Sequence, residues 1–460
     1  MITIILLNII IILQYSLNIN LCQDIGDDHT CIDSDPQEPP IYNIKCLFTL
    51  KSYQTSILES LNQKSNCTLT YGRYFYQTDY SVNPYSSPEV KINRLKPNIT
   101  KVNICEQYNN KYLKEIYRVV SNSNVSTLKG ITSLSRVLPV NLTSITFNDD
   151  LDEELFAGYL PPNLKKLKFK WYSSFNQAIE PGVLSNTLKK LKFGECFNQP
   201  IEPNVLPASL TFLELGLDFS ETLQVGSLPP NLRVLKCYGN SAISDGVLPK
   251  SLCTLESPLS WMPFIKSLDN LTTLRLSQSD SYSLGISVNL ADLPVSLTNL
   301  NISTSCILTS SISPSIRYLD IHHTEYDIDE IFKDRSRYNF ERLCVNGAKN
   351  ESLDNLKIKE LKLQFYKHAS FMRDIPFGVE TLNIGYFALK NIVAKVIPSS
   401  VKKVIFQNNE PIDQMDFKIP DSVEEVEILN FISDKPLSSF LLPNSAKSLT
   451  IPFVMVQHQK

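Results

Sequence analysis

The sequence predicts a β-rich solenoid, in which short parallel strands stack along a continuous sheet. Three observations predict this fold class: a leucine pattern that recurs about every 22 residues, a β-favouring residue near the end of each copy, and the presence of 27 prolines. Self-similarity at such a period is the signature of a repeat architecture. Frequent proline disfavours long helices between the strands, because proline removes a hydrogen-bond donor and clashes with the preceding turn.

The repeat is clearest over residues 138–257. Its copies begin at residues 138, 160, 184, 206, 228 and 248, and LPASLTFLEL (206–215) shows the pattern. Degenerate copies follow over 258–374 and clear copies return over 375–451, while LKPNITKVNI (95–104) indicates an earlier start. We therefore expect a sheet of about 14–15 short strands, spaced at about 4.8 Å.

Each copy is expected to form one short strand, because its leucines alternate with residues that point to the other side. One such strand cannot bury its leucines, but strands stacked in parallel form a continuous apolar ladder. Each fully buried leucine then contributes about 1.5–3 kcal/mol. In the return segments we expect Asn198 to hydrogen-bond loop backbone along the stack, and one short helix between Asp327 and Ser336.

The repeat resembles the FNIP-repeat family, which is leucine-rich-repeat-like. The resemblance is carried by FNQPIEPNVLPASLTFLELG (197–216), FNQAIEPGVLSNTLKKLKFG (175–194) and ISDGVLPKSLCTL (243–255). It implies a right-handed coil with a parallel sheet and mostly irregular, non-helical return segments, used for interaction rather than chemistry. The Phe-Asn-Gln element is absent after residue 200 and the units between 303 and 374 are irregular, so a uniform superhelix is not expected there.

The N-terminal region has the composition of an export leader. Residues 1–20 contain a short apolar run, which is typical of a signal peptide cleaved between residues 16 and 22, although an uncleaved anchor is the alternative. An acidic flexible leader is expected over 21–40 and a cysteine-containing cap with irregular early repeats over 41–137. The solenoid is expected over 138–451, followed by a tail over 452–460.

An exported chain can carry N-glycans and disulfides. Seven Asn-x-Ser/Thr sequons are candidate glycosylation sites: Asn66, Asn98, Asn124, Asn141, Asn270, Asn301 and Asn350. Five cysteines before the clear repeats are candidate disulfide partners, with unknown pairing: Cys22, Cys31, Cys46, Cys67 and Cys105. The five cysteines within the repeats are expected to act as buried apolar residues, and Cys237 falls on an apolar strand position.

Composition and motifs indicate an interaction protein rather than an enzyme. The net charge is −3 and no second apolar run reaches membrane length, so neither a nucleic-acid partner nor a further membrane span is expected. Asp320, His322, His323 and Glu325 form a His-bearing group, but adjacent strand residues point to opposite faces, so His322 and His323 are not expected to share a metal. We predict no catalytic, cofactor or metal site, and a monomer.

The candidate binding surface is the strand-lined face opposite the leucines. Its outward residues in the clear repeats are Lys166, Lys168, Lys190, Lys192, Phe212, Glu214, Val234, Lys236 and Tyr238. The lysines are either a basic patch for an anionic partner or simply solvated residues; Phe212, Val234 and Tyr238 are either an aromatic contact surface or chance strand residues. A glycan on Asn301 would obstruct the middle of this face.

Two functions fit these observations. The first is a secreted or cell-surface, non-enzymatic repeat protein that binds a protein or glycan through the strand-lined face. The alternative is a passive structural spacer glycoprotein of the extracellular surface, without a discrete binding site.

Overall fold

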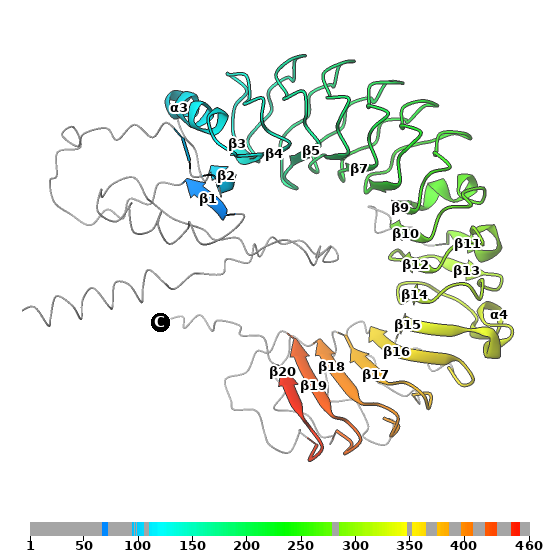
Figure 1. Cartoon of the computed structure of the whole chain (residues 1–460). Coiled ribbons are helices and arrows are strands. Elements are labelled where there is room, and N and C mark those ends of the chain that lie inside the picture. The colour runs from blue at the N-terminus through cyan, green and yellow to red at the C-terminus, as the bar shows by residue number, and fades with distance from the viewer. Residues whose placement is uncertain are drawn as a thin grey trace, which may run out of the picture. The chain divides into compact units, whose positions relative to one another are not determined.

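The computed structural model describes residues 94–95, 97, 99–104, 110–277, 285–346, 352–364, 375–385, 397–407, 419–429 and 443–450, together with the backbone of 67–71. These residues form a parallel β-solenoid with little helix (Figure 1). The chain divides into two compact units, residues 1–193 and 194–460. The expected signal peptide and acidic leader, and Cys22, Cys31, Cys46 and Cys105, lie outside the described residues.

In the first unit, each strand pairs in parallel with the next one along the chain. The helix α3 (Asn110–Ser121) precedes the third strand. The strands are β1 (Cys67–Tyr71), β2 (Ile99–Ile104), β3 (Thr127–Ile131), β4 (Ser144–Phe147), β5 (Lys166–Phe169) and β6 (Lys190–Lys192).

The second unit continues the same parallel pairing from β7 to β20, and β11 (Ser287–Asn289) pairs separately with β13 (Ile307–Thr309). Its main strands are β7 (Phe212–Leu215), β8 (Val234–Cys237), β9 (Thr254–Pro258), β10 (Thr273–Ser277), β12 (Asn299–Ile302), β14 (Tyr318–Asp320), β15 (Asn339–Asn346), β16 (Lys357–Gln364), β17 (Thr381–Ile384), β18 (Lys403–Gln407), β19 (Glu425–Leu429) and β20 (Ser448–Thr450). Its short helices are η1 (Leu259–Phe264), η2 (Leu290–Asp292), α4 (Ile328–Ile331) and η3 (Arg335–Arg337).

In the coils that carry it, the leucine-proline sequence of the repeat forms a turn just before the strand. The backbone N–H of Leu164 donates to the carbonyl of Pro161 at 3.1 Å, and Leu210 donates to Pro207 in the same way at 2.9 Å. A four-residue turn with this hydrogen bond reverses the chain compactly. The next residue, Lys165, then donates to Thr143 of the preceding coil at 2.8 Å. The motif therefore both ends the return segment and sets the strand in register.

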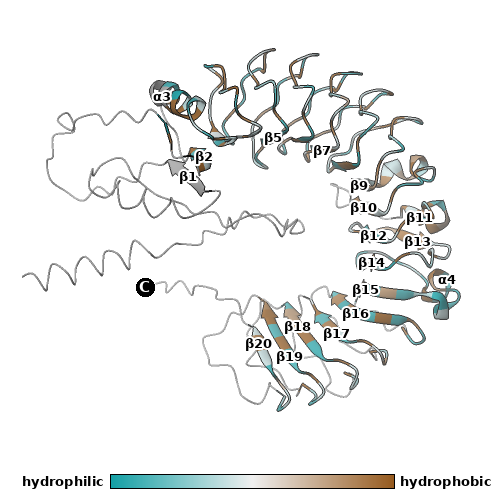
Figure 2. Ribbon diagram, in the orientation of Figure 1, coloured by the Kyte–Doolittle hydropathy of each residue, from teal (hydrophilic) through white to brown (hydrophobic). Residues whose placement is uncertain are grey.

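The buried faces of the strands form the predicted apolar ladder. Leu213, Leu235 and Leu255 occupy paired positions on β7, β8 and β9, and all three are fully buried. In the first unit, the rings of Phe147 and Phe169 pack beside the leucines in a tilted arrangement, with centroids 5.1 Å apart. Figure 2 shows hydrophobic and hydrophilic residues on the same strands, as period-2 alternation requires.

Among the described residues, the main parallel strands of the two units number eighteen. This is more than the 14–15 expected. The three that the leucine-proline pattern missed are β1, β3 and β15. In β3 the pattern is interrupted by Gly130, where the pairing register with β4 shifts. Gly130 has φ +78°, and a Cβ there would lie 1.9 Å from the carbonyl oxygen of Ile104. Only glycine fits this close approach of two strands.

The return segments are mostly non-helical, as predicted. One short helix was expected between Asp327 and Ser336; the structure instead has two separate short helices there, α4 and η3, and η3 ends at Arg337. The side chain of Asp327 caps α4 by accepting hydrogen bonds from the N–H groups of Asp329 and Glu330. Asn198 is half-buried, and its Oδ1 accepts a hydrogen bond from the Ser220 N–H of the next coil at 2.9 Å, which confirms its expected role.

Helix α3 was not predicted. Its residues Leu113, Tyr117 and Val120 are buried, and their spacing of four and three places them on one helical face. This helical spacing is present in the sequence, but the segment was expected to form irregular strand repeats instead. None of the helices among the described residues combines the length and apolarity needed to cross a bilayer.

Replacing a ladder leucine should destabilise the fold strongly. Leu235→Ala removes a side chain with no solvent exposure, so we expect the free energy of unfolding, measured by urea denaturation, to fall by about 2–5 kcal/mol. Val225→Ala, at a position 63% exposed, should change it by less than about 0.5 kcal/mol. Equal effects of the two substitutions would contradict the ladder.

Candidate functional site

The outer face consists of the strand residues that alternate with the buried leucines. On β5 and β6 the strand pairing sets Lys166 beside Lys190 and Lys168 beside Lys192. Lys166 and Lys168 are exposed, and Lys190 and Lys192 are half-buried. We call these four residues the lysine cluster. Like charges at paired positions of a sheet destabilise it slightly.

In the second unit, charges of opposite sign alternate across neighbouring strands. Pairing sets Glu214 beside Lys236, Lys236 beside Glu256, and Glu256 beside Arg275. Arg275 Nε lies 3.2 Å from Glu256 Oε1, and Lys236 Nζ lies 3.9 Å from Glu256 Oε2. We call these four residues the charge ladder. Glu256 thus forms ion pairs with the basic side chains on both neighbouring strands.

Glu256 is the centre of the charge ladder. Only 5% of its surface is exposed, and burial raises the pKa of its carboxyl, against the opposing effect of Arg275 and Lys236 and of a hydrogen bond from Tyr238. Of the predicted binding residues, Glu214, Lys236 and Tyr238 therefore belong to an internal network. Phe212 and Val234 lie side by side on β7 and β8, each half-buried.

Two of the predicted glycosylation asparagines belong to the strand-starting turn. The Asn141 amide donates to the carbonyls of Val125 at 2.7 Å, Val120 at 3.1 Å and Ser123 at 3.3 Å. Asn270 donates in the same way to Lys250 at 2.9 Å. An Asn before the closing leucine of the turn, followed by Thr, creates a sequon as a by-product of the repeat.

The other sequons differ in their surroundings. The exposed Asn124 amide donates to Pro97 O at 3.2 Å, and the half-buried Asn301 amide donates to Asp320 Oδ2 at 3.3 Å. Asn66, Asn98 and Asn350 lie outside the described residues. Occupancy of the sequons stays a prediction.

The cysteines of the repeats follow the apolar expectation in part. Cys237 is fully buried on the leucine side of β8, as predicted, and Cys306 is buried as well. Cys196 and Cys253 are half-buried. For Cys67, only the backbone in β1 is described.

The geometry predicted for the histidines is wrong. Strand β14 ends at Asp320, so His322 and His323 lie in the following turn rather than on opposite faces of a strand. Their ring centroids are 3.9 Å apart. Glu325 instead forms a backbone bridge with Ile307. The strand rule failed because the chain turns one residue before the first histidine.

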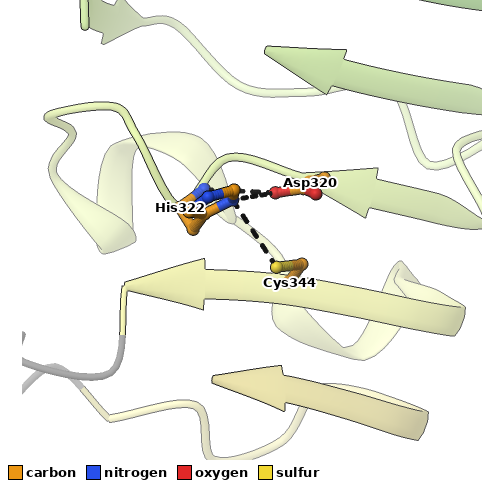
Figure 3. Close-up of side chains that lie close together, drawn as sticks. All are labelled: Asp320, His322 and Cys344. Carbon is orange, nitrogen blue, oxygen red and sulfur yellow. Dashed lines mark hydrogen bonds and ion pairs between the residues drawn. The ribbon is translucent and has the colours of Figure 1, made fainter. Parts of the chain in front are cut away.

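His322 meets two further side chains, Asp320 and Cys344 (Figure 3). His322 Nδ1 lies 2.5 Å from Asp320 Oδ1 and 3.7 Å from Cys344 Sγ. We call Asp320, His322 and Cys344 the Asp-His-Cys cluster. Sequence reasoning missed Cys344, because the pairing of β14 with β15 that brings it opposite Asp320 joins segments 24 residues apart.

Protonation in the cluster follows from burial and hydrogen bonding. Burial, reinforced by the Asp320 charge, raises the pKa of the Cys344 thiol. Burial also acts to raise the pKa of Asp320, but the hydrogen bond and charge of His322 outweigh it and lower that pKa. Burial, with the neighbouring His322, lowers the pKa of His323 to about 4.

This arrangement does not form a nucleophilic triad. In a Cys-His-Asp triad the two ring nitrogens contact different partners, one the nucleophile and the other the carboxylate. Here Asp320 and Cys344 both contact Nδ1 of His322. The Cys344 thiol is also buried with a raised pKa, whereas a reactive thiol needs a lowered one.

Comparison with known proteins identifies the repeats. The family model described as FNIP Repeat matches residues 134–170 and 175–218. These segments are FNIP repeats. The resemblance seen in the sequence is therefore confirmed, and the FNIP repeats contain β4 to β7 and thus the whole lysine cluster.

No curated protein matches the chain. Among solved structures, the chain is similar to CroV588, described as a novel circular LRR protein, at 21% identity over 86% of this chain and 67% of that one, with a TM-score of 0.47. It also matches the plant peptide hormone receptor RGFR1 in complex with RGF2, at 12% identity over 77% and 69%, with a TM-score of 0.28.

The Asn141 amide should act in folding rather than as a glycan acceptor. Asn141→Ala removes the amide donor from the carbonyls of Val125, Val120 and Ser123, so we expect the free energy of unfolding to fall by about 1–3 kcal/mol. Asn124→Ala, at an exposed amide, should have a smaller effect. In chain secreted from a eukaryotic host, peptide mass spectrometry should find Asn141 unmodified, and a glycan there would contradict this role.

Removing Arg275 should expose the cost of burying Glu256. Arg275→Met takes away the cation that lies 3.2 Å from the carboxylate, so we expect the free energy of unfolding at pH 7 to fall by about 1–3 kcal/mol. The pKa of Glu256, already raised by burial, should rise further. When the pKa of a carboxyl is higher in the folded state than in the unfolded state, the folded protein loses stability as the pH rises above the unfolded-state pKa. The difference from wild type should therefore shrink toward pH 4.

The matched control is Lys266→Met, which breaks an exposed pair with Asp292 at 2.9 Å. Urea unfolding of this variant should differ from wild type by less than about 1 kcal/mol. An Arg275→Met effect that is equally large at pH 4 and pH 7 would show that Glu256 is not its cause.

Proposed function

We propose that the protein is a secreted or cell-surface, non-enzymatic repeat protein that binds an acidic macromolecule, in the first instance a protein, through the outer face of its FNIP repeats. Its leucine-rich-repeat-like fold belongs to a class that often mediates protein binding. The single observation that carries the proposal is the lysine cluster, whose four side chains occupy paired positions on β5 and β6.

The contrast between the two units supports the lysine cluster as the binding surface. In the charge ladder, each acidic residue has a basic residue beside it on the next strand. In the lysine cluster, lysine stands beside lysine in both rows. Such a local positive field attracts acidic partners and speeds their association at low salt.

Export is proposed from the apolar N-terminal run and the sequons. A non-enzymatic role is proposed because a single ring nitrogen of His322 contacts both of its partners, which is not the geometry of a nucleophilic triad. A monomer is proposed, and neither nucleic acid nor a further membrane span is included.

The second candidate is a passive extracellular spacer. The charge ladder favours the spacer function, because its acidic and basic side chains lie beside one another. That part of the outer face therefore has no excess of either charge. In this case no part of the face would bind a partner in saturable fashion.

Charge reversal tests the binding proposal. The full-length chain is titrated with fluorescent poly-L-glutamate, with heparin and with neutral dextran at physiological salt. We expect saturable binding of poly-L-glutamate, weakened at least tenfold by Lys168→Glu with Lys192→Glu and weakened by added salt, because surface charges are screened. Tighter binding of heparin than of poly-L-glutamate would redirect the proposal to an acidic glycan.

The matched control is Lys165→Glu with Lys189→Glu, two exposed lysines on the same coils but before the strands. This variant has the same change in net charge and should bind as wild type does. Equal loss in both double variants would mean that overall charge, not the outer face, governs binding. If wild type binds neither polymer, the spacer function is favoured.

A further inference from the structure

The Asp-His-Cys cluster brings three kinds of metal-ligating atom to one place on the outer face. Asp320 on β14 and Cys344 on β15 are paired positions. Their neighbours Leu319 and Leu343 are buried on the opposite side of the sheet, so Asp320 and Cys344 share the outer face. The turn after β14 places the His322 ring against both (Figure 3).

The distances are close to those of a coordination sphere. One ligand atom from each of the three residues lies within 4.8 Å of the other two. With Zn–S of about 2.3 Å and Zn–N of about 2.0 Å, a tetrahedral centre would separate sulfur and nitrogen by about 3.5 Å. Cys344 Sγ lies 3.7 Å from His322 Nδ1. The Asp320 oxygen, hydrogen-bonded at 2.5 Å, would have to withdraw by less than about 1 Å.

We propose that Asp320, His322 and Cys344 form a binding site for a divalent transition-metal ion of the zinc class. The set of donors selects this class, because thiolate and imidazole suit Zn²⁺, whereas Ca²⁺ and Mg²⁺ require oxygen ligands. A thiolate and a carboxylate together balance the charge of a divalent ion. Neutral imidazole is the third ligand, so three of the four tetrahedral positions are filled by the protein.

The site is partly accessible to solvent. The side chains of His322 and Asp320 are 13% and 24% exposed, while Cys344 is buried beneath them. An ion would therefore reach the three ligands from the outer face. The fourth position would face solvent, where water or an acidic side chain of a bound macromolecule would fill it. Closed structural zinc sites use four protein ligands, whereas three protein ligands leave the metal able to take another.

Asn301 is the positioning residue of the site. Its Nδ2 donates to Asp320 Oδ2 at 3.3 Å, from the paired position on β12. The Asp320 Oδ1 atom is then the one that faces His322. Partners that hold a metal-ligating group in this way typically change metal affinity 10–100-fold when removed.

Cobalt titration tests the site, because Co²⁺ replaces Zn²⁺ in tetrahedral sites and a thiolate ligand gives it a near-ultraviolet charge-transfer absorption. The full-length chain, treated with chelator, should bind one equivalent of Co²⁺ with this absorption that Zn²⁺ then displaces. Cys344→Ser and His322→Gln should each lose that equivalent. Cys253→Ser, which removes a half-buried thiol elsewhere in the same unit, should retain it.

The result that would overturn the proposal is an unchanged cobalt spectrum in Cys344→Ser or His322→Gln, or the absence of cobalt binding in wild type. Either would leave the cluster as a hydrogen-bonded network only. His322→Gln keeps the test decisive if Cys344→Ser fails to fold, since His322 lies in a turn.

A second pair of variants separates positioning from glycosylation. Asn301→Ala should weaken cobalt binding about 10–100-fold without changing its stoichiometry. Ser303→Ala destroys the same sequon but keeps the Asn301 amide, so its cobalt affinity should equal that of wild type. Equal weakening in both variants would contradict the role of the amide.

Discussion

Parallel pairing of short strands, with a leucine, isoleucine or valine of each coil directly beside one of the next, is the constraint on which the rest of the structure depends. A four-residue strand cannot bury its apolar side alone, and its backbone groups need partners on both sides. The turn that begins at proline solves both problems. It ends the return segment and places the next N–H against the previous coil, as Lys165 does with Thr143.

The same register that buries the leucines also fixes the outer face. Because side chains alternate along a strand, each outward residue is held beside its counterpart on the next coil. The chain uses this constraint in three ways: the lysine cluster groups like charges, the charge ladder alternates them, and the Asp-His-Cys cluster gathers different ligand atoms. The residues that determine function are therefore the outward ones, whose identity the repeat pattern does not fix.

The strands and the outward positions could be predicted because they follow local periodicity. Lys166 and Lys190 could be paired from spacing alone. The missed features depend on contacts between coils. Strand β3 contains Gly130, whose fit against Ile104 is a tertiary effect. Cys344 lies opposite Asp320 only through the β14–β15 pairing, and β15 lacks the leucine-proline lead. The burial of Glu256 and its ion pair with Arg275 could not be predicted either, because both depend on the register of three neighbouring strands.

The register itself is tested most directly by disulfide trapping across β7 and β8. Phe212 and Val234 are paired outward positions, so the double variant Phe212→Cys, Val234→Cys should form a disulfide under mild oxidation, which peptide mass spectrometry identifies. Cα atoms farther apart than about 7 Å cannot be bridged without backbone movement. Phe212→Cys with Lys236→Cys, two residues out of register, should therefore remain reduced. Preferential bridging in the second variant would contradict the register on which both the core and the outer face depend.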